Sequence, residues 1–455
     1  MTAQDTQVGK SAGGKYGLKQ TTELGAFPST LGQIALAQLF LGRHKAVSWA
    51  EVRALKLAAR GKNAGSVRTN PAWQKLALDP SYKDTNFGNS IILPLKTTGN
   101  IAAQLNKLGG TQKAAWVLWV GQKPATFGQL PELLTQLLAK NLPNESKSIV
   151  AINFYGSVAQ NAQQLRRALK RSLKEQKKPV KLAGDLRKSF YNSATSLKVL
   201  SKNGYEFNVT EHNNLLVVSK TFWVQDFRLW QRVDIDRPFR DMRVGMLPSK
   251  LARIMLNLAR LKKGDAFWDP FAGLGTTLMQ AQLLGIYAFG SDVDREILKK
   301  AEENIKWLLK TGLVPEINYR LFEFDVLKNP RYNKVLRQVI RRGRFDAIVT
   351  EGYLGEPKTR VFKNKAQALA QWRKISLLYK ALFKNLLPTL RVGGRLVVSL
   401  PMYKYRQNNR VKWFKPHAEF SKVRFEQISF NTGELEWVNP KSVVARRLIV
   451  LERKK

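Results

Sequence analysis

The 455-residue chain contains no cysteine, which excludes disulfide bonds, thiolate catalysis and zinc sites built on cysteine. Its three histidines, His44, His212 and His417, are far apart in the sequence and suggest no metal-ligand cluster. No apolar run reaches the roughly eighteen residues that a transmembrane helix needs. The first residues are polar and lack the apolar core of a signal peptide, which predicts a cytoplasmic protein. Neither a metal ion nor a membrane is an expected partner.

Acidic residues are also scarce. The chain has 77 lysines and arginines against 33 aspartates and glutamates, a formal net charge of +44. Both halves of the chain carry the excess, so it does not come from a basic tail. A field of this strength favours a polyanionic partner, and nucleic acid is the predicted one. An anionic membrane and a merely solvated surface are the alternatives.

The expected elements divide the chain into a leader, two small domains and one large domain. Residues 1–30 lack periodicity and predict a disordered basic leader. Strand and helix candidates of α+β type fill 31–124 and 125–222, and 223–247 is the expected linker. From 248 to 455 strands and helices alternate, which predicts an α/β fold with a parallel sheet covered on both faces. Seven strands are expected there: 266–269, 287–292, 319–325, 345–350, 395–399, 425–430 and 444–452.

A capping box is predicted in the first small domain. Ser48-Trp49-Ala50-Glu51 has the spacing at which the serine and glutamate side chains satisfy each other's backbone amides. It predicts a helix that begins at Ser48 and continues through Ala59.

A helix in the second small domain concentrates positive charge. Its lysines and arginines recur at i, i+3, i+4 and i+7, with Glu175 as the one interspersed acid. This spacing suits a phosphate backbone, and an ordinary solvated face is the alternative. The predicted RNA-binding residues are Arg166, Arg167, Lys170, Arg171, Lys174, Lys177 and Lys178.

The most informative run of residues is Asp269-Pro270-Phe271-Ala272-Gly273-Leu274-Gly275-Thr276-Thr277, which lies between an expected strand and an expected helix. Its glycines allow the backbone to approach a ligand, and the first amides of the helix stay free to donate hydrogen bonds. A dinucleotide-binding turn would need a third glycine where Leu278 stands, and Asp269 would crowd a pyrophosphate. The run instead predicts S-adenosylmethionine as the cofactor, with Asp269 facing its cationic amino-acid end.

Two further acidic residues complete the predicted cofactor site. Asp292 ends the next expected strand, where a carboxylate can accept hydrogen bonds from both ribose hydroxyls. Asp325 ends the third expected strand, where the adenine amine of the cofactor would be recognised. The alternative is a plain glycine turn, with Asp292 capping the helix that starts near Asp294. The predicted cofactor-binding residues are Asp269, Phe271, Gly273, Gly275, Thr276, Asp292, Val293, Asp325 and Val326.

A resemblance to a known family is carried by segment 234–252, DIDRPFRDMRVGMLPSKLA. It resembles the entry to the catalytic domain of THUMP-domain tRNA guanosine-N2-methyltransferases, which act on the position-ten guanosine. The family's Asp-Pro-Phe-x-Gly-x-Gly-Thr pattern is matched from Asp269 to Thr276. The resemblance implies tRNA as partner and a C-terminal seven-stranded, Rossmann-like, class I methyltransferase domain. It also implies ferredoxin-like and THUMP-like RNA-binding domains before it. Further landmarks that look similar are 108–113, 194–195, 220–221 and 225–227.

In that family the target loop follows the fourth strand, and members with this type of sequence carry Thr-Glu-Pro-Tyr-Leu-Gly. This chain reads Thr350-Glu351-Gly352-Tyr353-Leu354-Gly355, so Gly352 stands in place of the proline. An exocyclic amine is a poor nucleophile, and hydrogen-bond acceptors must orient its lone pair toward the methyl carbon. Tyr353 can stack on a base turned out of its helix. The predicted catalytic residues are Thr350, Glu351, Gly352 and Tyr353.

Together these features predict an enzyme that transfers a methyl group from S-adenosylmethionine to the N2 amine of a guanosine in tRNA. One alternative keeps the chemistry and changes the substrate to another structured RNA or to an amine in DNA. Another is an RNA-binding protein that has lost catalysis, because glycine relaxes the backbone that a proline would hold. For Gly352 itself, an ordinary turn after a strand is the structural alternative.

Overall fold

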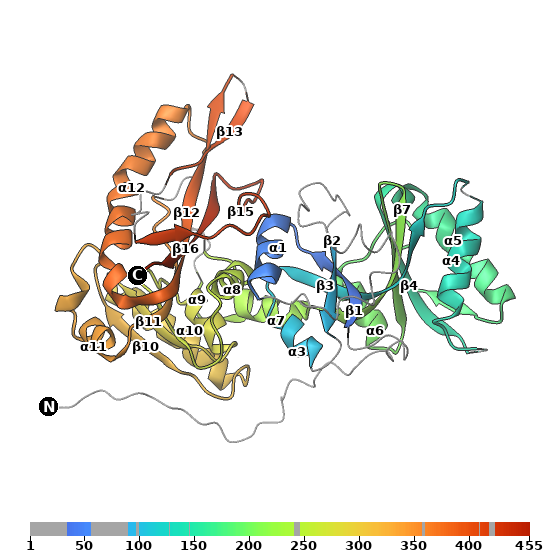
Figure 1. Ribbon diagram of the computed structural model, residues 1–455, viewed down its shortest axis with the longest axis horizontal. Coiled ribbons are helices and arrows are strands. Elements are labelled where there is room, and N and C mark those ends of the chain that lie inside the picture. The colour runs from blue at the N-terminus through green and yellow to red at the C-terminus, as the bar shows by residue number, and fades with distance from the viewer. Residues whose placement is uncertain are drawn as a thin grey trace.

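The computed structural model describes residues 34–55, 90–96, 100–126, 128–144, 146–240, 246–356, 360–408, 410–417 and 424–455. Two sheets organise this part of the chain and lie toward opposite ends of its long axis (Figure 1). The N-terminal half forms a seven-stranded sheet and the C-terminal half a nine-stranded one. The predicted leader, 1–30, lies outside the described residues.

The first sheet has the strand order β2-β1-β3-β7-β6-β4-β5. Strand β4 runs parallel to β5 and β6, and the other neighbours are antiparallel. Because β3 pairs with β7, strands of both predicted small domains lie in one sheet, while the boundary near residue 124 stays a prediction. The strands are β1 (Ile34–Leu41), β2 (Ser90–Lys96), β3 (Thr111–Gln122), β4 (Ser148–Tyr155), β5 (Val180–Leu182), β6 (Tyr205–His212) and β7 (Leu215–Val224).

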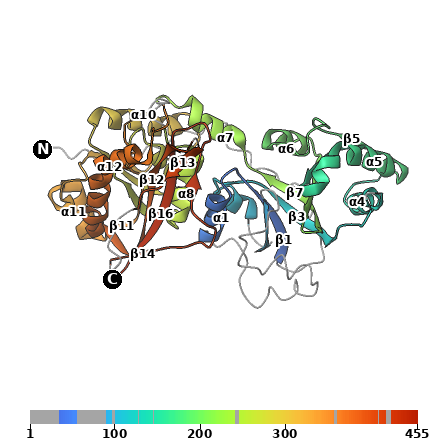
Figure 2. The same ribbon diagram turned by 90° about the horizontal axis from the view of Figure 1, so that it is seen from above.

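Helices α4 (Gln129–Ala139) and α5 (Ala162–Glu175) cover the outer part of this sheet, as Figures 1 and 2 show. Helix α5 buries Leu165, Leu169 and Leu173, which are spaced by one helical turn and therefore share a face. Arg166 is buried as well, and the other lysines and arginines of this helix are exposed. The further helices of this half are α3 (Ile101–Leu105) and α6 (Ser193–Leu200).

Helix α1 (Lys45–Ala54) departs from the prediction at its N-terminus. Its N-cap residue is His44, so the capping box at Ser48 is wrong. The Ser48 hydroxyl lies inside the helix and donates to the His44 carbonyl at 3.0 Å. Glu51 is fully buried and has its partners outside the helix. The helix ends at Ala54, and Ala59 lies outside the described residues.

All seven predicted strands are present in the second sheet, which follows the order β10-β9-β8-β11-β12-β16-β14, and two additional strands, β13 and β15, make nine. The first five strands in this order are parallel, and β16 and β14 are antiparallel to their neighbours. Strand β12 is much longer than predicted, because its end continues beyond β11 and pairs with β13. The strands are β8 (Ala266–Asp269), β9 (Tyr287–Asp292), β10 (Tyr319–Glu323), β11 (Phe345–Glu351), β12 (Leu390–Gln407), β13 (Arg410–Phe414), β14 (Phe425–Gln427), β15 (Glu436–Trp437) and β16 (Val444–Arg453).

Helices cover both faces of this sheet, as the alternating pattern predicted (Figure 2). Successive strand residues enter different cores: Phe267 packs with α8, α9 and α10, whereas Trp268 packs with α11 and α12. The α/β fold class is therefore confirmed. In the described ranges no helix is both long and apolar enough to cross a membrane. The helices are α7 (Phe227–Gln231), α8 (Ser249–Leu258), α9 (Thr276–Gln282), α10 (Arg295–Lys310), α11 (Lys334–Arg342) and α12 (Lys365–Asn385).

The two halves meet where α1 packs on α8, and Val47 shares a hydrophobic core with Leu251. Within this junction the Glu51 carboxylate accepts hydrogen bonds from the Gly109 amide at 2.7 Å, the Gly110 amide at 2.9 Å and Asn257 Nδ2 at 2.6 Å. Burial raises the pKa of Glu51 to about 7, and these donors act against that rise. A buried acid on α1 thus holds both the 109–110 turn and helix α8.

Candidate active site at the carboxyl edge of the parallel sheet

Three neighbouring parallel strands place predicted site residues at one edge of the second sheet. Strand β8 ends at Asp269, β9 ends at Asp292, and β11 ends at Glu351 immediately after Thr350. The carboxyl ends of parallel strands form the edge where open α/β sheets bind their ligands. The structure therefore brings the predicted cofactor loop and the predicted target loop together.

The two glycines of the cofactor loop have different structural roles. Gly275 is the N-cap of α9 with φ 79°, and an added Cβ would lie 3.2 Å from the Ala301 Cβ. Gly273 has φ 50°, and an added Cβ there would meet nothing within 4 Å. Gly275 thus allows the left-handed turn and close packing on α10. Gly273 leaves the loop backbone facing open space, which a ligand could fill.

Asp269 is a buried carboxylate, only 2% exposed, at the centre of this edge. It accepts a hydrogen bond from the Phe271 amide at 3.1 Å and one from the Thr350 hydroxyl at 2.6 Å. Burial raises the pKa of Asp269 to about 7, although hydrogen bonds from Thr350, Phe271 and Thr277 oppose the rise. A cation brought to this carboxylate would favour its ionised form.

Asp292 is held at the end of β9 by backbone amides. Its carboxylate accepts from the Gly273 amide at 3.0 Å and from the Asp294 amide at 3.1 Å, and burial raises its pKa. The N-cap of α10 is Asp294, whose Oδ1 accepts from the amides of Glu296 at 2.8 Å and Ile297 at 3.2 Å. The alternative in which Asp292 caps that helix is therefore wrong.

The remaining predicted cofactor residues differ in what they present to a ligand. Phe271 is half-buried beside the loop, and Val293 is an apolar side chain left 69% exposed. Asp325 follows the end of β10 and accepts from the Leu327 amide at 2.9 Å. The Val326 side chain is buried in the core that contains Trp268, so it is not exposed to a ligand.

In the target loop, Tyr353 is 43% exposed, whereas Thr350 is fully buried. Glu351 forms an ion pair with Arg446, whose Nη2 also donates to the Met246 carbonyl at 3.4 Å. Burial raises the pKa of Glu351, and Arg446 acts against this rise. Part of the hydrogen-bond acceptor capacity of the Glu351 side chain is thus engaged within the protein.

Gly352 packs directly on Tyr379, a residue of α12. An added Cβ at position 352 would lie 2.5 Å from the Tyr379 hydroxyl oxygen, and Tyr379 is only 3% exposed. That hydroxyl donates to the Tyr353 carbonyl at 3.1 Å, and the Tyr403 hydroxyl donates to the Leu354 carbonyl at 2.9 Å. Tyr379 therefore fills the space of a larger residue at 352, and two tyrosines hold the loop without the proline.

Sequence reasoning missed the residues that hold these loops in place. Arg237 is 2% exposed and donates from Nη1 to the Thr276 hydroxyl, the first residue of α9, at 2.8 Å. The only feature of the sequence that pointed to Arg237 was its position within segment 234–252, which carries the family resemblance. Arg446, Tyr379 and Tyr403 lie far from the loop in sequence, so no local pattern could have identified them.

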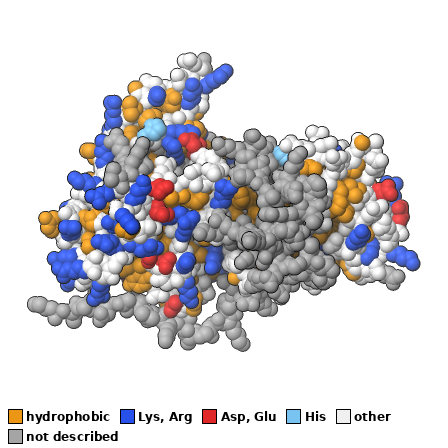
Figure 3. Space-filling model, in the orientation of Figure 1, with side chains coloured by type: hydrophobic (Ala, Val, Ile, Leu, Met, Phe, Trp, Pro, Cys, Tyr) orange, Lys and Arg blue, Asp and Glu red, His pale blue; other side chains and the backbone are white. Residues whose placement is uncertain are grey.

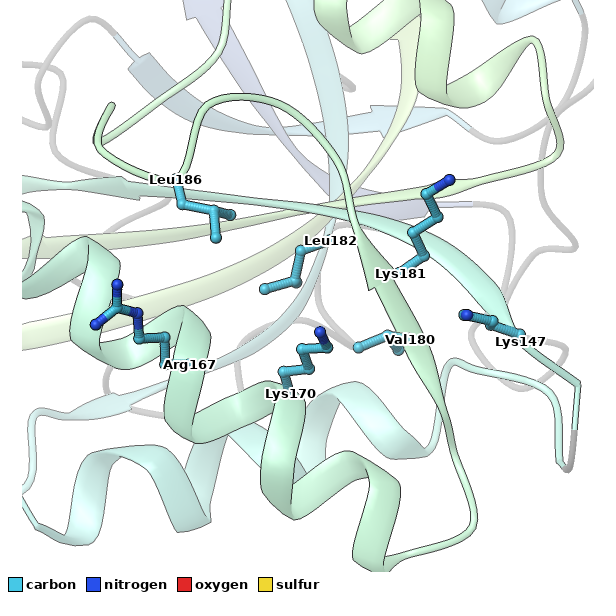
Figure 4. Close-up of a pocket in the computed structure, with 7 residues that line it drawn as sticks. All are labelled: Lys147, Arg167, Lys170, Val180, Lys181, Leu182 and Leu186. Carbon is cyan, nitrogen blue, oxygen red and sulfur yellow. The ribbon is translucent and has the colours of Figure 1, made fainter.

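A separate basic surface lies on the N-terminal half, where α5 and β5 enclose a pocket of about 480 Å³ (Figure 4). Two predicted RNA-binding residues, Arg167 and Lys170, line it together with Lys147 and Lys181, which were not predicted. Lys177 is exposed nearby, whereas Lys178 donates to the Leu142 carbonyl at 2.6 Å. The pocket therefore presents cations over an apolar floor. The remaining predicted residues, Arg171 and Lys174, are exposed on α5.

Arg166 does not belong to this basic surface, and its assignment to RNA binding needs correction. Its guanidinium is fully buried and donates to the carbonyls of Ile152, Leu186, Lys188 and Ser189 at 2.6 to 2.9 Å. Its side chain therefore ties α5 to β4 and to the segment after β5. Within a basic run, the sequence alone does not distinguish a lysine or arginine that faces the core from one that faces solvent.

Comparison with known proteins identifies the part of the chain that carries the candidate site. A family model described as UPF0020, RMKL-like, methyltransferase domain, matches residues 237–331, the range that holds Asp269, Asp292 and Asp325. This range is therefore similar to a methyltransferase domain. The match confirms the predicted methyltransferase fold, and it implies S-adenosylmethionine as the cofactor.

Curated relatives carry a more specific name. The tRNA (guanine(10)-N2)-dimethyltransferase of Methanocaldococcus jannaschii is 30% identical over 165 residues, which are 34% of this chain and 42% of that protein. The human tRNA (guanine(10)-N(2))-methyltransferase TRMT11 is 28% identical over 232 residues, 45% of this chain and 46% of its own. The chain thus spans less than half the length of these two relatives. They confirm the resemblance to tRNA guanosine-N2-methyltransferases.

Among solved structures, TrmN from Thermus thermophilus matches with a TM-score of 0.49 and 16% identity, covering 92% of this chain and 99% of that one. A possible methylase from Clostridium difficile 630 matches with a TM-score of 0.46 and 14% identity, covering 93% and 99%.

Proposed function

We propose that the protein is a tRNA (guanine-N2)-methyltransferase that transfers a methyl group from S-adenosylmethionine to the exocyclic amine of a guanosine. One observation carries the proposal: the Thr350 hydroxyl donates to Asp269 at 2.6 Å and so joins the target loop to the cofactor loop. The names of the relatives described above support tRNA and the N2 amine of guanosine as the substrate.

The residues at the carboxyl edge fit the proposed cofactor. S-adenosylmethionine, when bound, supplies an electrophilic methyl group on a positively charged sulfur. Asp269 offers a buried carboxylate to a cationic amino group, and Asp292 offers acceptor positions to ribose hydroxyls. Val293 offers an exposed apolar side chain to the adenine ring, and Asp325 lies at the end of the neighbouring strand.

The target loop would orient the guanosine amine. Tyr353 is exposed enough to stack on a base turned out of its helix. Backbone carbonyls near Glu351 and Gly352 would accept hydrogen bonds from the amine and aim its lone pair at the methyl carbon. The Tyr379 and Tyr403 hydroxyls fix the next two carbonyls of the loop, which limits its motion. The amine's proton can leave after transfer, so no strong base is required.

The N-terminal half would bind the RNA. We assign residues 31–124 to a ferredoxin-like domain, 125–222 to a THUMP-like domain, 223–247 to a linker and 248–455 to the methyltransferase domain. The cations around the α5–β5 pocket, Arg167, Lys170, Lys147 and Lys181, would contact phosphates. A tRNA substrate agrees with a cytoplasmic protein of net charge +44.

The direct test incubates the full chain with isotopically labelled S-adenosylmethionine and unmodified tRNA transcripts, followed by digestion and mass analysis of the nucleosides. N2-methylguanosine is the expected product. A Tyr353→Ala variant serves as the matched control, because it should bind the cofactor normally and yield little product. Unlabelled tRNA from the wild-type protein, with cofactor binding intact, would contradict the proposal.

A further inference from the structure

The β12–β13 hairpin projects from the edge of the sheet that holds the candidate active site. Glu351, the last residue of β11, pairs with Ser399, and β12 continues from there to Gln407. At about 3.3 Å per residue, the hairpin tip lies roughly 26 Å beyond the end of β11. Figure 1 shows the hairpin standing away from the rest of the domain beside α12.

This hairpin belongs to a stretch without acidic side chains. Between Pro357 and Ala418 the sequence has no aspartate or glutamate, and lysines and arginines recur along its whole length. Near the base of the hairpin, Lys415 is neutralised by ion pairs with Glu434 and Glu436. At the tip, Arg406, Arg410 and Lys412 are exposed, and no ion pair to them occurs among the described residues. Figure 3 shows cationic side chains at this projecting end.

Strand register places an apolar side chain beside Arg406 and an aromatic one beside Lys404, whereas Arg410 and Lys412 pair with Gln407 and Tyr405 on the opposite face of the hairpin. Arg406 pairs with Val411, which is 55% exposed, and Lys404 pairs with Trp413, over whose ring its Nζ lies at 5.2 Å. Because directly opposed residues of an antiparallel pair share a face, Arg406, Val411, Lys404 and Trp413 lie on one side of the hairpin. The Lys404 ammonium also donates to the Pro440 carbonyl, so Arg406 is the cation of this face that is left for a phosphate, and the partly exposed indole of Trp413 can contact a base.

The base of the hairpin is bonded to the target loop. Tyr403 donates to the Leu354 carbonyl, and Phe362, which follows the loop, pairs with Tyr405 and packs its ring against Tyr403 at 5.6 Å. A partner held at the tip is therefore fixed relative to Tyr353. A separate docking site for an acidic protein would not need this connection.

The geometry points to a second RNA-binding surface at the tip of this hairpin, formed by Arg406 on one face and Arg410 and Lys412 on the other, which contacts the phosphate backbone of the RNA whose base enters the target loop. The inference rests on the proposed function, because its ligand is the same substrate RNA. Its surface lies on the catalytic half, apart from the α5–β5 pocket. The RNA would thus be contacted by both halves of the molecule.

The test compares two triple variants of the full chain in tRNA binding at several salt concentrations. Arg406→Gln/Arg410→Gln/Lys412→Gln removes the tip charges. Lys300→Gln/Lys310→Gln/Arg320→Gln is the matched control, since these residues are exposed on α10 and on β10, the opposite edge strand. We expect the tip variant to bind tRNA on the order of tenfold more weakly, with a salt slope lower by roughly 2 to 3. The salt slope of the control variant should decrease by less than half as much as that of the tip variant. Both variants should bind S-adenosylhomocysteine normally.

Equal losses in the two variants would overturn the inference, because general electrostatics would then explain them. If the wild-type protein methylates tRNA and the tip variant binds tRNA with the same affinity and salt slope, the inference is overturned but the proposed function stands. The hairpin would then be tested for binding of an acidic polypeptide instead. A selective loss in the tip variant without any methylated product would support the surface and contradict the proposed reaction. Wild-type protein that binds no tRNA would overturn both.

Discussion

The Thr350 hydroxyl donates a 2.6 Å hydrogen bond to Asp269, although the two residues belong to different strands and different predicted sites. Thr350 belongs to the target loop and Asp269 to the cofactor loop. Because both groups are buried, the bond is shielded from water and keeps its strength. The predicted cofactor loop and the predicted target loop are thereby joined through one buried contact.

The first prediction concerns the pH dependence of cofactor binding. Burial raises the pKa of Asp269 to about 7, so the group is protonated below that pH and ionised above it. A cationic ligand prefers the ionised form, so affinity should fall as pH drops through about 7. Between about pH 7.5 and 5.5 we expect the affinity for S-adenosylhomocysteine to fall on the order of tenfold, measured by titration calorimetry. Asp269→Asn should bind weakly with a flat pH profile, and an equally flat wild-type profile would contradict this assignment.

The second prediction concerns the tyrosines that hold the target loop. Tyr379→Phe removes the donor to the Tyr353 carbonyl and should slow methyl transfer roughly tenfold, because the loop would no longer be fixed. Affinity for S-adenosylhomocysteine should not change. Tyr405→Phe is the control, since its hydroxyl contacts Gln407 rather than the loop. Equal single-turnover rates for the two variants would show that Tyr379 does not position the loop.

The third prediction concerns Gly352. An added Cβ would lie 2.5 Å from the buried Tyr379 hydroxyl, so Gly352→Ala should destabilise the protein by about 1 to 3 kcal/mol through overpacking. Gly352→Pro, which restores the residue common in related loops, should likewise reduce activity rather than raise it. Urea unfolding and turnover on tRNA measure the two effects. A more active proline variant would mean that the loop has lost efficiency through the glycine.

The fourth prediction separates two neighbouring arginines of α5. Arg167→Gln should leave stability unchanged and lower the salt slope of tRNA binding by roughly 1, because an exposed phosphate contact is lost. Arg166→Gln should destabilise the protein by about 3 kcal/mol, because buried carbonyls lose their donors. Thermal unfolding and tRNA binding should therefore rank the two variants in opposite orders.

The fifth prediction concerns the junction between the halves. Glu51→Ala leaves the buried amides of Gly109 and Gly110 and the Asn257 side chain without their acceptor. We expect a loss of about 3 kcal/mol in the free energy of unfolding and faster hydrogen exchange at the two glycine amides. Lys45→Ala, an exposed change in the same helix, should stay within about 0.5 kcal/mol of the wild type. Unchanged exchange at Gly109 would argue against Glu51 as the connector.

Local sequence was sufficient to predict an element where its functional residues and its hydrophobic pattern indicated the same structure. The strands ending at Asp269 and Asp292 were predictable because short apolar runs, glycines and spaced acids all indicated the same elements. Contacts between residues distant in the sequence were not predictable. The ion pair of Glu351 with Arg446 and the packing of Tyr379 on Gly352 join different elements, and only the fold brings them together. Ser48 failed as a cap because the residues before it continue the helix to Lys45.

The pairing of β3 with β7 has a consequence for synthesis on the ribosome. Strand β3 ends at Gln122, but the partner that covers its second edge, β7, begins only at Leu215. At a translation rate of about 5 to 20 residues per second, that edge stays open for roughly 5 to 20 seconds while the chain between them emerges. An open edge is a template for pairing with other chains, so nascent chains are most exposed to aggregation in this interval.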